Sequence, residues 1–405
     1  MSALFEGLRV VEIASFVFAP GAGTVMADFG AEVIHVEPPG IGDPMRVLYK
    51  LRPLPESEEN YCWMHESRNK KSIVLDLKQA AGHDVAVDLI RSADVLITNY
   101  QPSVLNELNL SYETVRKINP RLIFAHATGY GEAGDEVEKP GYDATAWWAR
   151  SGMMNAVRPA DAELAMSTAA MGDHPSSISL LAGISMALYA REKSGEGTKV
   201  SSSLMANGVW SNSLLIQSAL CGAPPYLPPT QATTSNAMLN HYRTSDGQAF
   251  FLLLIKEADE FGTFCDAIGR EDLARDVRFA ELSNRRANSQ ALVAILSELF
   301  ASQPLSYWRK LLDEHSITFG IIASNEEVVT DPQMHANDVF AEFADSPGQQ
   351  VVNSPISLAD YPKVAPLLPP TLGQHSDEIL TSLGYDENRV RTLKESGAVV
   401  GKSTL

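Results

Sequence analysis

The chain has 405 residues, of which 45% are apolar and 20% are charged, enough to bury a large core and to form two domains. Its formal net charge of −18 argues against nucleic acid or an anionic membrane as the main partner, because both require a basic surface. Cys62, Cys221 and Cys265 form no CxxC pair and exclude a disulfide framework, so a reducing cytoplasm is the expected compartment.

The start of the chain shows no pattern of a targeting segment. Residues Met1 to Arg9 contain no basic region followed by an apolar core. No run approaches the roughly 20 apolar residues that span a bilayer. We therefore expect a protein that is neither exported nor inserted in a membrane.

Strand-like and helix-like patterns alternate from Leu8 to about Ser201. This alternation predicts a parallel sheet with helices packed on its faces. The short runs rich in β-branched residues that we expect to be strands are Leu8–Ile13, Glu32–Val36, Ser72–Leu75, Val95–Thr98 and Leu122–His126.

The first of these strands runs toward Gly21 and Gly23, which we expect to form a turn before a helix. The arrangement imitates a dinucleotide-binding fingerprint, but Met26 stands where the third glycine should be and Pro20 precedes the turn. An ordinary strand-to-helix turn is therefore favoured, with a nicotinamide or flavin site as the alternative.

Gly172-Asp173-His174-Pro175 precedes a helical pattern from Ser179 to Ala190. Pro175 suits the first turn of that helix, which places Asp173 at or just before its N-terminus, where backbone N–H groups and the macrodipole favour the ionised carboxylate. Such a carboxylate is suited to attack a thioester carbonyl. From these residues alone, an ordinary N-cap aspartate is the favoured interpretation.

Three further groups of polar residues have two interpretations each. His126, His174 and the other histidines match no zinc-binding spacing, so we expect packing or surface histidines and no metal. Asp143 suits a cap or a turn. Lys70 and Lys71, just before a strand, are either a solvated pair or a grip on a ligand phosphate.

The prolines between Ala219 and Gln231 predict a linker, which we place at residues 219–227 between a large domain at 1–218 and a smaller α+β domain at 228–322. In the smaller domain, Asp246-Gly247 predicts a hairpin turn. The flanking elements are expected at 242–247 and 250–255, with helical segments at 257–268 and 289–314, and the tail has an extended stretch at 362–370 and an amphipathic stretch at 376–383.

In their order and spacing, these residues resemble the class III CoA-transferases, the family of formyl-CoA transferase and carnitine CoA-transferase, which also contains α-methylacyl-CoA racemase. The similarity runs from residue 5 to about residue 380, nearly the whole chain. No single stretch is specific on its own. The matching stretches are Phe5–Glu12, Asp28–Glu37, Asn69–Leu77, Asn99–Tyr100, Gly129–Gly131, Gly172–Asp173, Arg191–Gly197, Asp246–Gly247 and Leu372–Glu378.

The resemblance implies an α/β fold with a Rossmann-like parallel sheet in a large CoA-binding domain, a smaller α+β domain and an interlocked-ring homodimer. Residues 323–405 would then be a linker and a C-terminal return to the large domain. It also implies an enzyme that moves CoA from an acyl-CoA donor to a carboxylic acid acceptor through aspartyl anhydride and aspartyl-CoA thioester intermediates. No tightly bound cofactor is expected, because the CoA thioester is itself a substrate.

The same resemblance implies the roles of individual residues. Asp173, at the Gly-Asp position of the family, is the expected catalytic nucleophile, which replaces the N-cap interpretation. Gly129, Tyr130 and Gly131 are expected to line the acyl pocket. The residues expected to bind CoA are Phe16, Val17, Phe18, Lys71, Leu75, Asn99, Tyr100 and Gln101.

Departures from the family pattern limit the expected substrates and the expected reaction. Glu107 and Thr128 replace basic residues of formyl-CoA transferase, Val17 replaces its glutamine, and no glycine-rich loop lies between residues 230 and 240, so oxalate and formyl-CoA are disfavoured substrates. Racemases have a histidine at the position of Tyr142, and a tyrosine with a pKa near 10 is a weak base at pH 7. Transfer is therefore favoured over a racemase-like isomerisation, which stays the alternative.

Overall fold

The computed structural model describes residues 3–159 and 162–401, which form two compact units. Unit 1 contains the described residues within 1–156, 165–224 and 338–405. Unit 2 contains those within 157–164 and 225–337. The expected small domain at 228–322 lies inside unit 2, whereas the residues from Asp338 onward belong to unit 1.

A seven-stranded sheet forms the centre of unit 1, in the order β12-β3-β2-β1-β4-β5-β6. Its neighbouring strands are parallel, except that β12 pairs antiparallel with β3. The five expected strands all belong to this sheet, whereas the serine-rich β6 and the two-residue β12 carry no clear strand pattern. The strands are β1 Arg9–Ile13, β2 Glu32–Glu37, β3 Lys71–Leu75, β4 Val95–Thr98, β5 Ile123–Thr128, β6 Lys199–Ser203 and β12 Val399–Val400.

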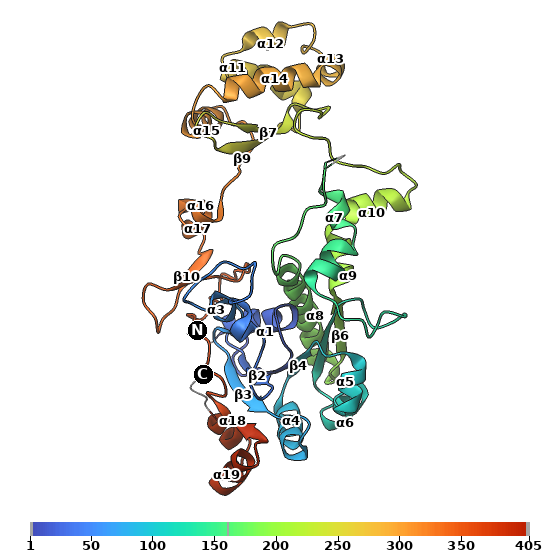
Figure 1. The fold of residues 1–405 in the computed structure, drawn as a ribbon, viewed down its shortest axis with the longest axis vertical. Coiled ribbons are helices and arrows are strands. Elements are labelled where there is room, and N and C mark those ends of the chain that lie inside the picture. The colour runs from blue at the N-terminus through green and yellow to red at the C-terminus, as the bar shows by residue number, and fades with distance from the viewer. Residues whose placement is uncertain (1–2, 160–161, 402–405) are drawn as a thin grey trace. The chain divides into compact units, whose positions relative to one another are not determined.

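Helices cover both faces of this sheet (Figure 1). Val10 packs with Ala22 of α1 and Leu180 of α8 on one face, whereas Val11 packs with Leu89 of α4 on the other, as the alternation of strand side chains requires. The helices of this unit before residue 225 are α1 Phe18–Asp28, α2 Met45–Leu48, α3 Tyr61–Ser67, α4 Ala80–Ser92, α5 Pro102–Glu107, α6 Tyr112–Ile118, the π-helix η1 Asp143–Ala149, α7 Met153–Ala156, α8 Asp173–Ser194, α9 Leu204–Ser211 and α10 Ser213–Leu220.

Gly21 and Gly23 lie inside α1, so the turn expected at these residues is wrong. A Cβ on Gly21 would lie 2.5 Å from Ser177 Oγ of α8, and a Cβ on Gly23 would overlap the Glu12 carboxylate of β1. The two glycines therefore allow α1 to pack closely against its neighbours. The same glycine spacing occurs in phosphate-binding turns, so the local sequence does not distinguish the two roles.

Unit 2 contains a three-stranded antiparallel sheet in the order β7-β8-β9. The expected hairpin is confirmed, with Gly247 at φ 81° in the turn between β7 and β8. The expected helical segment at 289–314 is two helices, because Pro304 cannot continue the helix before it. The elements are β7 Leu239–Arg243, β8 Ala249–Leu253, β9 Phe319–Ile321, α11 Glu257–Ala267, α12 Glu271–Arg275, α13 Leu282–Ala287, α14 Ser289–Phe300, α15 Leu305–Glu314, α16 Asn325–Val328 and α17 Pro332–Ala336.

The C-terminal part of unit 1 begins with the antiparallel strands β10 Phe340–Glu342 and β11 Gln350–Val352. The proline-rich stretch at 362–370 is extended, as expected, and leads to the helices α18 Ser376–Ser382 and α19 Glu387–Glu395. None of the helices in the described residues has both the length and the apolar character needed to cross a bilayer.

Candidate active site

Asp173 begins α8, as the sequence predicts, and Pro175 lies in the first turn. Gly172 packs so closely against η1 that a Cβ on this residue would lie 2.5 Å from Cγ of the Trp147 ring. Ser177 Oγ donates to the Asp173 carbonyl at 2.9 Å. Close packing before the helix and a side-chain hydrogen bond within its first turn thus hold the position of Asp173.

The surroundings of Asp173 favour its protonated form. The pKa of this carboxyl group is raised from 3.8 to about 7, chiefly by burial and then by the charges of Asp143 and Glu66, whereas His174 acts in the opposite direction. The expectation that the helix N-terminus keeps Asp173 ionised is therefore wrong, because desolvation and like charges outweigh the macrodipole.

Asp143 is the acidic residue whose charge acts most strongly on Asp173. It begins η1, where its Oδ1 accepts a hydrogen bond from Ala144 N–H at 2.6 Å. Its buried Oδ2 has no hydrogen-bond partner within the described residues. A capping role accounts for one oxygen, and the second is available to a bound molecule.

Glu66, His174 and His65 form a cluster between α3 and the start of α8, hereafter the Glu66–His174–His65 cluster. The buried carboxylate of Glu66 accepts from His174 Nε2 at 2.7 Å and lies 3.7 Å from His65 Nε2. Burial would lower the pKa of His174, but the hydrogen bond and charge of Glu66 raise it on balance.

The polar atoms of this cluster lie within 4.8 Å of one another, a spacing that would admit a metal ion only if the Glu66–His174 hydrogen bond broke. Glu66 and His65 are absent from the sequence-based site. No local motif indicates them, because they meet His174 only when α3 packs beside α8.

The segment Phe16–Phe18, expected to bind CoA, spans the loop after β1 and the first residue of α1. Phe16 has φ 66°, and its N–H donates to Asp43 Oδ1 at 3.3 Å. Asn99, which follows β4, binds the backbone of Ser15 through its Oδ1 at 3.1 Å and its Nδ2 at 2.7 Å. The structure thus brings Phe16–Phe18 and Asn99 together at the carboxyl edge of the sheet.

A buried charge network supports this loop through Asp43. His35 bonds Asp43 through Nε2 at 3.1 Å and Glu12 through Nδ1 at 2.8 Å. Burial would lower the pKa of His35, but these carboxylates raise it to about 9. Lys70 Nζ lies 3.0 Å from both Glu12 oxygens, so Lys70 belongs to the core and does not grip a phosphate.

Tyr100 and Gln101 continue the chain from Asn99 at the same edge. The carbonyl of Tyr100 accepts from His126 Nε2 at 2.9 Å, and Gln101 Nε2 donates to the Glu138 carbonyl at 2.6 Å. These bonds join the segment to β5 and to the loop that follows β5.

Lys71 and Leu75, the two remaining residues expected to bind CoA, are the ends of β3. Lys71 Nζ lies 2.7 Å from the carboxylates of both Glu32 and Glu378. Leu75 is buried in the core. Lys71 is paired with two carboxylates and Leu75 is in the core, so their assignment to CoA binding depends on the resemblance alone.

Gly129, Tyr130 and Gly131, expected in the acyl pocket, follow β5. A Cβ on Gly129 would lie 2.7 Å from the Cα of Gly141, so this loop runs directly against the segment that leads to Asp143. Tyr130 is buried at this contact. The structure thus brings the expected acyl-pocket residues to the same loops as Asp143.

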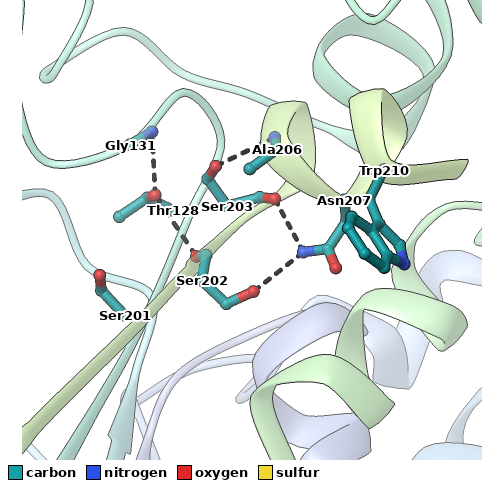
Figure 2. A pocket seen from close by; sticks show the side chains of 8 residues that line it. All are labelled: Thr128, Gly131, Ser201, Ser202, Ser203, Ala206, Asn207 and Trp210. Atoms are coloured by element: carbon teal, nitrogen blue, oxygen red, sulfur yellow. Dashed lines mark hydrogen bonds between the residues drawn. The ribbon is translucent and has the colours of Figure 1, made fainter. Parts of the chain in front are cut away.

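A cavity of about 340 Å³ has Gly131 in its wall and includes serine, threonine and asparagine side chains as well as Trp210 (Figure 2). Thr128 Oγ1 accepts from Gly131 N–H at 3.0 Å, and Asn207 Nδ2 donates to Ser202 Oγ at 2.9 Å. Asp173 is not among the residues around this cavity. The lining residues are Thr128, Gly131, Ser201, Ser202, Ser203, Ala206, Asn207 and Trp210.

Comparisons with known proteins identify the family of the chain. The model of CoA-transferase family III matches residues 5–376. The (R)-2-hydroxy-4-methylpentanoate CoA-transferase of Clostridioides difficile is 33% identical over 98% of this chain and 99% of its own. The cinnamoyl-CoA:phenyllactate CoA-transferase of Clostridium sporogenes is 31% identical over 97% and 96%, respectively.

Solved structures show the same relationship. A CAIB/BAIF family protein from Brucella suis superimposes with a TM-score of 0.84 and 27% identity, covering 95% of this chain and 100% of the other. Mixed α/β architecture with a mainly parallel sheet, a partly buried aspartate at the start of α8 and full-length similarity lead to one conclusion. The chain belongs to CoA-transferase family III and is an enzyme of that class.

Proposed function

We propose that this enzyme transfers CoA with Asp173 as the nucleophile. The Asp173 carboxylate attacks the donor thioester carbonyl, the C–S bond breaks, and CoA leaves as a thiolate, which gives a mixed anhydride. The thiolate attacks the aspartyl carbonyl and releases the donor acid as its carboxylate, leaving an aspartyl-CoA thioester. The acceptor carboxylate then attacks this thioester, and the same steps in reverse give the new acyl-CoA and free Asp173.

The observation that carries the proposal is the partly buried position of Asp173 at the start of α8, with a pKa raised to about 7. A carboxylate that has lost much of its hydration is a better nucleophile once ionised, and it still ionises at neutral pH. Each step exchanges one activated acyl bond for another, so the free energy of the donor thioester is retained in the product.

For CoA itself, we propose a path along the carboxyl edge of the sheet, past Phe16–Phe18 and Asn99–Gln101. The hydrogen bonds between Asn99 and Ser15 support this assignment, because they hold the two loops beside each other. Gly129–Gly131, packed against Gly141, would then line the acyl side of the site.

The acceptor we propose is a monocarboxylic acid with an apolar side chain, and 2-hydroxy acids are the first candidates because of the two relatives named above. The charged groups that shift the pKa of Asp173 within the described residues include no lysine or arginine. Nearby, the rings of Phe16 and Tyr142 meet edge to face at 5.9 Å. These surroundings favour an apolar group over a second carboxylate, which requires a cationic partner.

The test is to trap the intermediate. Wild-type enzyme incubated with donor acyl-CoA and then borohydride should be modified at Asp173, located by peptide mass spectrometry. Asp173→Asn should give no adduct and lose more than about a thousandfold in transfer rate, because the nucleophile is gone, while CoA binding measured by calorimetry persists.

Two outcomes of this experiment would contradict the proposal. One is an adduct on Asp143 in place of Asp173. The other is deuterium wash-in at the α-carbon of acyl-CoA without exchange of CoA between acids, which would indicate the racemase-like isomerisation.

A further inference from the structure

The Glu66–His174–His65 cluster lies beside Asp173 but takes no part in the bond-making steps proposed above. The carboxylate of Glu66 is 4% exposed, whereas the side chain of His174 is 45% exposed. Glu66 belongs to α3 and is fixed where α1, α3 and α8 meet, since its main-chain carbonyl accepts a hydrogen bond from Thr24. One nitrogen of the imidazole is thus held by a buried acid, while nearly half of the side chain is accessible.

The ring of His174 has a donor to spare. Its hydrogen bonds within the described residues use Nε2, which donates to Glu66 Oε1 at 2.7 Å. When the ring is protonated, Nδ1 carries a second N–H. The buried carboxylate orients the ring and stabilises its positive charge, as an acid behind a catalytic histidine does in other enzymes.

The acceptor acid needs such a group. It enters as an anion, and the negative charges of Asp143 and Glu66 already surround Asp173. These negative charges oppose the approach of the acceptor carboxylate to Asp173. His174 is the positively charged group among the described residues whose charges act on Asp173.

We propose that His174 binds the carboxylate of the acceptor acid through Nδ1–H and holds it beside the aspartyl-CoA thioester, with Glu66 as the positioning residue behind it. This inference rests on the proposed function and assigns to it the group that receives the second substrate. The charged and titratable groups that face His174 are Glu66 and His65 from α3, Asp143 from η1 and Asp173 from its own helix.

Steady-state kinetics with donor and acceptor varied separately test the role of His174. His174→Gln should raise the KM for the acceptor about ten- to a hundredfold, the value of one charge-assisted hydrogen bond. The amount of aspartyl-CoA trapped with donor alone should stay within about threefold of wild type. His174→Arg, which keeps a cation, should recover much of the acceptor affinity, and His315→Gln, at an exposed histidine in unit 2, should change nothing.

The pH profile tests the role of Glu66. In the aspartyl-CoA form Asp173 no longer titrates, so kcat/KM for the acceptor should fall as pH rises through the pKa of His174, which Glu66 holds above its ordinary value. Glu66→Gln should move this fall to lower pH.

An unchanged acceptor KM in His174→Gln, or loss of the trapped adduct in that variant, would overturn the assignment. Loss of acceptor binding in a chelator, restored by Zn²⁺, would replace it with a metal site. Failure of the proposed function would look different, since wild-type enzyme itself would then show no adduct on Asp173.

Discussion

Asp173 combines a position that favours negative charge with surroundings that oppose it. The N-terminus of α8 offers unpaired N–H groups, yet burial and the charge of Asp143 raise its pKa to about 7. A carboxylate with an ordinary pKa would ionise fully at neutral pH but would be a weaker nucleophile. The raised pKa makes the first half-reaction depend on pH within the neutral range.

We expect the rate of aspartyl-CoA formation to rise with pH between about 6 and 8, because in the proposed mechanism the ionised form of Asp173 attacks the thioester. Asp143→Asn removes one neighbouring negative charge and should move the midpoint of this rise to lower pH. Rapid quenching with donor alone, at a series of pH values, measures the midpoint. Asp135→Asn, at an exposed position, is the matched control, and equal midpoints in the two variants would show that Asp143 does not act on Asp173.

At the scale of elements, glycines in α1 allow this helix to pack closely against β1 and α8, because a side chain at these positions would overlap neighbouring atoms. Gly23 faces Glu12 of β1, the residue that also receives Lys70 and His35. The loop with Phe16 precedes this helix, so its position depends on how closely α1 approaches the sheet.

Gly23→Ala should therefore lower the thermal stability of the protein, by about 1–3 kcal/mol, because the added methyl group overlaps the Glu12 carboxylate. Gly262→Ala in α11 is the control, since nothing lies within 4 Å of a Cβ there and the change should stabilise by about 0.5–1 kcal/mol. Circular dichroism melting of both variants gives the comparison. Equal melting temperatures would mean that α1 adjusts to a side chain at position 23.

For the whole molecule, exposed apolar side chains gather on helices α8 to α10 of unit 1. Trp210 is 79% exposed and Leu214 is 85% exposed. Soluble monomers rarely expose large side chains of this kind together. The other exposed apolar residues of these helices include Met186, Tyr189 and Leu220.

We propose that a second copy of the chain covers this surface in a homodimer, the assembly that the family resemblance implies. Sedimentation velocity at nanomolar concentration should show a dimer and no folded monomer. Trp210→Ser with Leu214→Ser should weaken the dimer, because both substitutions remove apolar area from the contact. An active, stable wild-type monomer would refute the interlocked assembly.

Much of the fold is predictable from local patterns. The β-branched runs mark β1 to β5, the Asp246-Gly247 pair marks the hairpin of unit 2, and Pro175 places Asp173 at the start of α8. These features depend on backbone preferences and near neighbours in the sequence, which the pattern itself contains. The order of the stretches that match the family also indicates the family, which the match over residues 5–376 confirms.

The charge states and contacts of the candidate site were decided by tertiary structure. The sequence predicts an ionised Asp173, but its raised pKa arises from burial and from Asp143, thirty positions earlier in the chain. From the sequence, Lys70 is either a solvated side chain or a ligand-binding cation, but in the structure it pairs with Glu12 at 3.0 Å in the core. Glu66 accepts a hydrogen bond from His174, which lies 108 positions later in the sequence. By itself the sequence determined strands β1 to β5, the hairpin of unit 2 and which aspartate begins α8. Only packing between distant segments decided which charges meet, because electrostatic effects depend on distance in space and on exclusion of water.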